Sequence, residues 1–470
     1  MKETKYKQTE ACQTKDERRE TKESTRHCEE RSDVAIQGGF KMTEVGLIPN
    51  DWEIKPLKDI AGLKAGKMTS YNDFNPKYPC FGGNGIRAYL SHYSHDGIYP
   101  IIGRQGELCG NVNLAKGKFY ATEHAVVASP KKDIDAIWLY YQLTVLNLNQ
   151  YATGCAQPGL SVEKINDVYT QVPPTIEEQQ RISNALSDVD TLIANLEKFI
   201  AKKKNIKQGA MQQLLTGKKR LPGFGLDYGH TDWFTPNGVH EKSIKTAKVV
   251  GPESIRVKDK EQCAGFKMTE LGLIPTDWEV KKIGDFCKVY DGTHQTPHYV
   301  DVGIPFYSVE NVSADDFEHT KFISNSEYEF ISKRASIEKG DVLMTRIGSI
   351  GVCKYVDWDC KSGFYVSLSL LKCNEKIDAR YLCQQSKSEA FKKEIELHSL
   401  TTAIPQKINL GPISQVRIIV PISKAEQTAI ANVLSDMDTE ISALETKLAK
   451  YRTLKTGMMQ QLLTGKIRLV

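Results

Sequence analysis

Two long segments of the chain carry apolar residues at alternating spacings of four and three positions. This alternation places apolar side chains on one face of a helix and is typical of a heptad seam. The pattern predicts two helices of about 40 residues, each roughly 60 Å long. The seam positions are Ile182, Leu186, Val189, Ile193, Leu196 and Ile200 in the first segment, and Ile430, Leu434, Met437, Ile441, Leu444 and Leu448 in the second.

Residues that interrupt helices flank both segments. Pro173 and Pro174 precede the first segment and Pro421 precedes the second, whereas Gly217 and Gly465 follow them. Proline cannot be placed in a helix interior, and glycine is favoured directly after a helix end. These five positions therefore predict where the two helices begin and end.

The two predicted helices pair most simply with each other, in antiparallel orientation, because they belong to one chain. A coiled coil with a second chain is the structural alternative. In the first segment the seam continues to Lys203 and Lys207. Ammonium groups do not fill an apolar seam, so we expect weaker packing there.

The chain contains an internal repeat. Residues 40–55 return 226 positions later as residues 266–281, and residues 178–218 return 248 positions later as residues 426–466. The segments between these blocks differ between the two copies. Repeated ends around dissimilar middles predict a shared frame that carries two different specificities. Simple duplication followed by drift is the alternative.

Short alternating or apolar runs rich in glycine and aromatic residues fill both middle segments, and they predict strands. The sequence therefore predicts an α+β fold with internal pseudo-two-fold symmetry, in which two mostly β bodies are separated by two long antiparallel coiled-coil helices. The predicted segments are a disordered N-terminal extension (1–39), a first body (40–172), a first spacer helix (173–217), a linker (218–265), a second body (266–420), and a second spacer helix with its tail (421–470).

Composition places the chain among globular proteins, with 40% hydrophobic and 26% charged residues. No apolar run approaches the roughly 20 residues that cross a bilayer, and the charged N-terminus does not resemble a secretory signal. We expect a cytoplasmic protein whose eleven cysteines are reduced thiols. The net charge of +5 permits nucleic-acid binding without requiring it.

Donor side chains on glycine-rich loops occur in both bodies. Arg104 lies in a Gly-Arg-Gln-Gly segment whose counterpart in the second copy contains Arg346. Arginine can bridge guanine O6 and N7 or hold a phosphate, and neighbouring glycines allow a close approach to DNA. Each residue alone is more often a solvated surface side chain; as a set they favour DNA contacts. The candidates are Lys64, Lys67, Asn84, Arg87, Arg104, Gln105, Lys116, Lys118, His294, Gln295, Thr296, Arg346, Lys361 and Ser362.

Catalytic motifs are not recognisable in this sequence. There is no phosphate-binding loop for ATP, and residues 81–85 are better explained as a tight turn than as a cofactor loop. Lys77 interrupts a segment that is similar to the Asn-Pro-Pro-aromatic motif of amino-methyltransferases. His294 and His298 have metal-like spacing, but Pro297 is incompatible with a helix interior. We therefore predict no catalytic residue and no metal site in this chain.

Taken together, the repeated motifs resemble those of the specificity (S) subunits of type I restriction-modification systems. The resemblance extends over nearly all of residues 40–469. It rests on Gly46-Leu47-Ile48-Pro49 followed by Trp52 and on its copy at 272–278, on residues 173–190, on 212–221 and its copy, and on 153–161 with the counterpart 401–410.

This resemblance implies a non-catalytic DNA-recognition subunit. Each body would be a target-recognition domain that reads one half of a bipartite DNA target, and the paired helices would set the spacing between the halves. Two modification (M) subunits, which use S-adenosylmethionine, and two restriction (R) subunits, which use ATP and Mg²⁺, would be its partners. We expect no cofactor in this chain.

Two other functional classes remain as alternatives. A coiled-coil scaffold or non-specific DNA-binding protein would bind duplexes irrespective of base sequence. A self-contained nuclease or methyltransferase is disfavoured because its motifs are missing.

Overall fold

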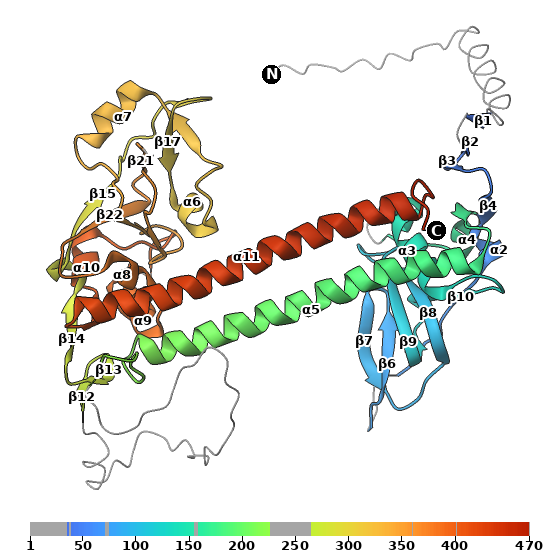
Figure 1. Ribbon diagram of the computed structural model, residues 1–470, viewed down its shortest axis with the longest axis horizontal. Helices are drawn as coiled ribbons and strands as arrows, with labels where there is room; N and C mark the ends of the chain where they lie inside the picture. Colours follow the sequence, from blue (N-terminus) through green and yellow to red (C-terminus); the bar gives the residue numbers. More distant parts are fainter. Residues whose placement is uncertain are drawn as a thin grey trace, which may run out of the picture. The chain divides into compact units, whose positions relative to one another are not determined.

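The computed structural model describes residues 35–36, 39–70, 75–154, 158–225, 265–359, 361–400 and 402–469. Most of the predicted N-terminal extension and most of the predicted linker lie outside these residues. The chain forms two compact units, each of which combines sheets with helices (Figure 1). The first unit comprises Met1–Lys198 and Thr446–Val470, and the second comprises Phe199–Glu445.

The first unit is built around a six-stranded sheet with the order β5-β10-β8-β9-β6-β7. A three-stranded sheet, β1-β2-β3, and the antiparallel pair β4 and β11 accompany it. The elements are β1 (Ala35–Ile36), β2 (Phe40–Thr43), β3 (Gly46–Pro49), β4 (Glu53–Pro56), α2 (Leu57–Ile60), β5 (Ala61–Ala65), β6 (Tyr78–Gly82), β7 (Gly85–Leu90), β8 (His95–Gly103), β9 (Val112–Ala121), β10 (Ala125–Pro130), α3 (Ala136–Val145), η1 (Leu148–Tyr151), α4 (Val162–Asn166) and β11 (Tyr169–Val172).

The second unit contains two four-stranded sheets, with the orders β15-β22-β19-β20 and β16-β18-β17-β21. The pairs β12-β13 and β14-β23 complete it. The elements are β12 (Phe266–Thr269), β13 (Gly272–Pro275), β14 (Trp278–Lys282), η3 (Ile283–Asp285), β15 (Cys287–Asp291), β16 (Tyr299–Val300), β17 (Ile304–Tyr307), α6 (Val309–Ala314), β18 (Lys321–Ile323), α7 (Asn325–Ser332), β19 (Val342–Thr345), β20 (Cys353–Tyr355), β21 (Gly363–Phe364), β22 (Leu368–Cys373), α8 (Ala379–Gln385), α9 (Glu389–His398), α10 (Leu410–Gln415) and β23 (Arg417–Pro421).

The repeated sequence blocks form the same strand pairs in both units. In the first hairpin Phe40 faces Pro49, and in the second Phe266 faces Pro275. The pair β4-β11 has the register Glu53 opposite Val172, and β14-β23 has Glu279 opposite Val420, which are the repeat-equivalent residues. Repeat-equivalent positions thus have equal register in both units, even in β11 and β23, which lie outside the repeated blocks.

The dissimilar middle segments share a core that their sequences did not reveal. In the first unit β5, β10, β8 and β9 follow one another in antiparallel order, as do β15, β22, β19 and β20 in the second. The units differ beyond this core. In the first unit, β6 pairs with β9 in parallel and extends the same sheet. In the second unit, β16, β18, β17 and β21 form a separate sheet.

The two long helices are α5 (Ile176–Leu214) and α11 (Lys424–Leu462), of 39 residues each (Figure 1, green and red). At 1.5 Å per residue each is about 58 Å long. Gly217 and Gly465 follow the helix ends with φ of 68° and 70°. This left-handed conformation favours glycine, which explains the repeated stop signal.

In each unit, the parts of α5 and α11 that belong to it contact one another through ion pairs. Asp190 and Glu197 bind Lys455 and Arg452 in the first unit, each with an N···O distance of 2.6 Å. In the second unit, three lysines of α5 bind acidic residues of α11. From Asp190 to Glu197 the partner number falls from 455 to 452, and from Lys203 to Lys207 it falls from 440 to 438, as antiparallel segments require. The second-unit pairs are Lys203–Glu440, Lys204–Glu445 and Lys207–Asp438.

The ion pairs modify the expectation for Lys203 and Lys207. These lysines interrupt the apolar seam, but each has a carboxylate partner on the facing helix. The predicted seam positions themselves are buried in part. Ile182, Leu186, Ile200, Ile430, Leu434 and Ile441 are buried, and Val189, Ile193, Leu196, Met437, Leu444 and Leu448 are half-buried.

The C-terminal end of each long helix docks onto the opening motif of the other copy. A Cβ atom on Gly217 would lie 2.4 Å from the Pro275 ring, and one on Gly465 would lie 2.5 Å from the Pro49 ring. Met211, Leu214 and Leu215 therefore share a core with Trp278, and Leu462 and Leu463 share one with Trp52. This crossed docking explains why both blocks recur with so little change.

One arginine follows each docked helix end and binds acidic residues of the opening motif and of the other long helix. In the second unit, Arg220 donates twice to Asp277, at 2.9 Å each, and also to Glu426, at 2.7 Å from Nη2. Trp278 Nε1 donates to the same Glu426 carboxylate at 3.2 Å. The hydrogen bonds from Arg220 lower the pKa of the Asp277 carboxyl group. In the first unit Arg468 binds Asp51 and Glu178 in the equivalent arrangement.

Candidate nucleic-acid interface

A pair of adjacent loops occupies the same place in both units. In the first unit Leu160 N donates to Arg104 O (2.8 Å) and Gly106 N donates to Pro158 O (3.0 Å). In the second unit Ile408 N donates to Arg346 O and Gly348 N to Gln406 O, both at 2.9 Å. These bonds confirm the correspondence that the sequence predicted between the two arginine-containing loops.

The first-unit candidates lie on loops and on strands, and most of them are exposed. Lys64 and Lys67 are exposed at the end of β5, and Gln105 is exposed beside the half-buried Arg104. Asn84 occupies the two-residue turn between β6 and β7, which confirms the tight turn predicted there. Arg87 on β7, and Lys116 and Lys118 on β9, are also exposed.

Aromatic side chains accompany these cations, and the sequence analysis missed them. Lys118 Nζ lies 4.7 Å from the centre of the Tyr93 ring. Tyr89 and Tyr93 are 53% and 44% exposed, so their rings are accessible for stacking on bases. Tyr89 lies on β7 and Tyr93 in the segment between β7 and β8, and no motif in the sequence marks either side chain as exposed.

Two second-unit candidates are buried, whereas the prediction of DNA contacts assumed that they are exposed. Arg346 is only 7% exposed, and its guanidinium donates to Ile408 O (3.2 Å) and Val366 O (3.4 Å). Burial lowers its pKa, while Asp291 lies 3.7 Å away and favours the charged form. Ser362 is 2% exposed. We therefore conclude that Arg346 stabilises the two adjacent loops of the second unit. The residues around it in the sequence do not reveal this role.

The other second-unit candidates gather at the mouth of a cavity of about 550 Å³. His294 Nε2 hydrogen bonds to the buried Asp291 carboxylate at 2.7 Å, and Arg334 pairs with the same carboxylate. His294 and Gln295 are exposed, as are Thr296 and Lys361 nearby. The further lining residues are Gly292, Thr293, Tyr328, Phe330, Ile331, Ser332, Lys333, Ala335, Ser362, Gly363 and Phe364. Donors beside aromatic walls suit contacts with bases and phosphates.

Asp277 and Trp278 have structural roles. Asp277 is bound by Arg220, and Trp278 is fully buried. Among the described residues, no three His, Cys, Asp or Glu side chains are placed to hold a metal ion. In the same part of the chain, no helix combines the length and apolarity needed to span a membrane.

Comparison with known proteins identifies the family. The sequence profile of the type I restriction modification DNA specificity domain matches residues 49–208 and again residues 275–450. The chain belongs to this family. The two matches correspond to the two copies of the internal repeat, so the type I specificity domain occurs twice.

Relatives with known names are type I specificity subunits. The EcoprrI specificity subunit of Escherichia coli is 49% identical over 144 residues, which are 29% of this chain and 36% of that subunit. The MjaVIII specificity subunit of Methanocaldococcus jannaschii is 25% identical over 465 residues, covering 91% of this chain and 96% of that subunit. Similarity to the second relative therefore extends over almost the full chain.

A solved structure shows the same fold. The S subunit of a type I restriction-modification system from M. genitalium matches with a TM-score of 0.60 and 15% identity. The match covers 91% of this chain and 99% of that chain. The type I specificity fold thus accommodates both units described above.

Proposed function

We propose that each unit of this chain reads one half of a bipartite DNA target as the non-catalytic recognition subunit of a type I restriction-modification complex. The observation that carries this proposal is that the two units share one structural framework but differ in the outer strands of their sheets. Both units share strand register, helix docking and the loop pair, but they differ in the strands beyond the four-stranded core. A shared frame with different outer surfaces fits two readers of different base sequences.

The two long helices would form an antiparallel coiled coil that fixes the spacing of the half-sites. In support, the ion pair Asp190–Lys455 in the first unit has its repeat-equivalent in Asp438–Lys207 in the second. Matched contacts of this kind are consistent with an internal pseudo-two-fold axis. Readers on one face of B-DNA are separated by whole turns of about 34 Å, and helices of about 58 Å are long enough to impose such a spacing.

The second-unit part of α5 would contribute to docking of the M subunits. Phe199 and Ile206 are seven residues apart and are 44% and 46% exposed. Apolar side chains at this interval lie along one stripe of a helix and suit an amphipathic partner helix. We expect two M subunits with S-adenosylmethionine, and two R subunits with ATP and Mg²⁺, to supply the chemistry.

A competition assay tests this proposal. The chain, assembled with its M subunits, should retain a labelled target duplex in the presence of excess unrelated duplex. A scaffold or non-specific binder would lose the label to unrelated DNA at equal concentration. Turnover by the isolated chain with Mg²⁺ and S-adenosylmethionine would instead support a self-contained enzyme.

Substitution of Arg104 refines the assay. If its guanidinium is bidentate to guanine, Arg104→Ala should weaken binding by about 1–3 kcal/mol, and only for duplexes with an intact first half-site. Lys132→Ala, at an exposed position of the same unit, serves as the control. Equal weakening for every duplex would identify a phosphate contact instead.

A further inference from the structure

We propose that a lysine-lined pocket in the second unit binds a phosphate group of an organic ligand. The pocket has a volume of about 610 Å³ and lies between the second-unit part of α5, the end of α8, α11 and the loop before β20. Its charged lining residues are Lys204, Lys207, Lys387, Lys392 and Asp438. Met211, Ile350, Val352 and Ile441 form apolar parts of the wall.

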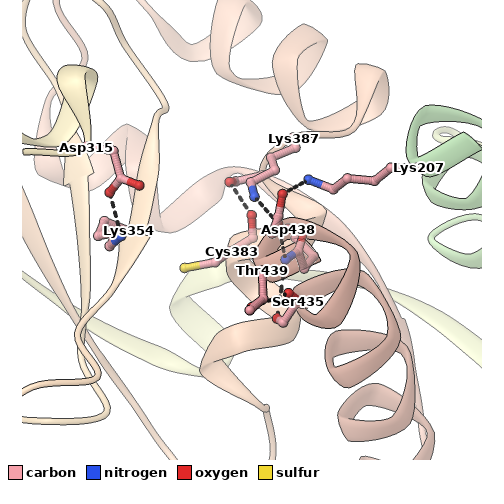
Figure 2. A network of polar contacts seen from close by, with 10 residues as sticks. Lys207, Asp315, Lys354, Cys383, Lys387, Ser435, Asp438 and Thr439 are labelled. Atoms are coloured by element: carbon pink, nitrogen blue, oxygen red, sulfur yellow. Dashed lines mark hydrogen bonds and ion pairs between the residues drawn. The ribbon is translucent and has the colours of Figure 1, made fainter. Parts of the chain in front are cut away.

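Positive charge exceeds negative charge in this pocket. Asp438 is shared by Lys207 and by Lys387, whose Nζ lies 3.1 Å from Oδ2 (Figure 2). It also accepts a hydrogen bond from Gln384. One carboxylate cannot neutralise two ammonium groups. A bound anion would supply the missing negative charge.

The remaining two lysines have partners outside the pocket lining. Lys204 pairs with Glu445 and Lys392 with Glu389, at N···O distances of 2.7 Å and 2.8 Å. The side chains of these acidic residues are 47% and 65% exposed, and exposed ion pairs are weak. Both lysines can therefore turn to an anion at little cost.

Enclosure makes the uncompensated charge significant. The Lys207 side chain is 13% exposed, and its pKa is lowered by burial and by the neighbouring Lys387 ammonium group. A partly desolvated ammonium group interacts more strongly with an anion than a fully hydrated one. The geometry therefore favours an anion beside Lys207 and Lys387.

The first unit lacks this arrangement at the equivalent position. Asp135 is the N-cap residue of α3 in the first unit, and Asp378 is the N-cap residue of α8 in the second. Nine residues after these caps, the first unit has Thr144 and the second has Lys387. Asp190, the equivalent of Asp438, binds Lys455 at 2.6 Å. There, Tyr141 donates to Asp190 at 2.7 Å. At this position the described part of the first unit has one ammonium group for one carboxylate, whereas the second unit has two, Lys207 and Lys387, for Asp438.

The size of the pocket indicates the class of ligand. A volume of about 610 Å³ falls in the range of about 300–1,000 Å³ typical of sites for organic ligands, and its wall is partly apolar. A phosphate ester, with ionic and carbon-rich parts, matches this lining. Its source is either a backbone phosphate of bound DNA or a free nucleotide.

Calorimetric titration of the full chain with inorganic pyrophosphate tests the site. We expect saturable binding by the wild type and affinity lower by about tenfold in Lys387→Thr, which introduces the first-unit residue. Lys339→Thr, with the same charge change outside the pocket lining, should bind as the wild type does. Asp438→Asn should bind more tightly, an effect opposite in sign to that of a damaged fold.

Two further titrations distinguish the sources. A nucleotide site is indicated if ATP displaces pyrophosphate and Lys387→Thr leaves DNA binding unchanged. A contact with the DNA backbone is indicated if a DNA duplex displaces pyrophosphate and Lys387→Thr reduces the slope of log affinity for DNA against log salt by about 1. The second outcome rests on the proposed DNA recognition. Equal pyrophosphate affinity of Lys387→Thr and wild type would overturn the site. Because pyrophosphate needs no target sequence, that result is independent of whether the proposed function holds.

Discussion

Exchange of residues 57–172 for the corresponding segment of another specificity subunit is expected to change one half of the methylated DNA sequence and leave the other half unchanged. These residues lie in the first unit and follow β4, the strand whose register is the same in both units. The exchanged body should therefore dock on an unaltered frame. Sequencing of methylated adenines in cells that also contain the M subunit measures the outcome.

A reciprocal exchange provides the control. Residues 283–420 are the equivalent segment of the second unit, which follows β14 and includes most of β23. Their replacement should change the other half of the sequence only. Altered bases in both halves after either exchange would refute the assignment of one half-site to each unit.

Arg220→Ala is expected to lower the free energy of unfolding of the second unit by about 3–5 kcal/mol. The substitution leaves the Glu426 carboxylate, which is 1% exposed, without its cationic partner. The hydrogen bond from Trp278 Nε1 to this carboxylate remains. An unpaired buried charge is far more costly than the loss of an exposed ion pair. Hydrogen exchange of peptides from the C-terminal part of α5 should accelerate accordingly.

Two variants separate this effect from a general loss of packing. Arg220→Ala combined with Glu426→Gln should recover part of the lost stability, because no unpaired charge remains. Arg468→Ala, the equivalent change, should accelerate exchange in the first unit instead, where Glu178 is the buried partner. A loss below about 1 kcal/mol in Arg220→Ala would show that the junction does not depend on this charge.

The parts of the fold that could be predicted are those encoded by short-range sequence. Heptad spacing and flanking glycines located α5 and α11 closely, because a helix depends on residues three and four positions apart. The correspondence of the loops around Arg104 and Arg346 was also correct. In each loop the glycine two residues after the arginine has a positive φ, 88° at Gly106 and 84° at Gly348, a local requirement that sequence displays.

Features that depend on distant partners could not be predicted. Arg346 is buried because Asp291, Val366 and Ile408 surround its guanidinium, and these residues come from three separate segments. The shared four-stranded core escaped detection because strand order is set by side-chain packing across the sheet, which unlike sequences can satisfy. Lys207 appeared to weaken the helix seam because its partner Asp438 lies 231 positions away.

Sequencing the methylated adenines in cells that contain this chain and its M subunit tests the account most directly. The account predicts two unlike half-sites separated by a constant number of unspecified bases. A single uninterrupted target, or half-sites at variable separation, would contradict it.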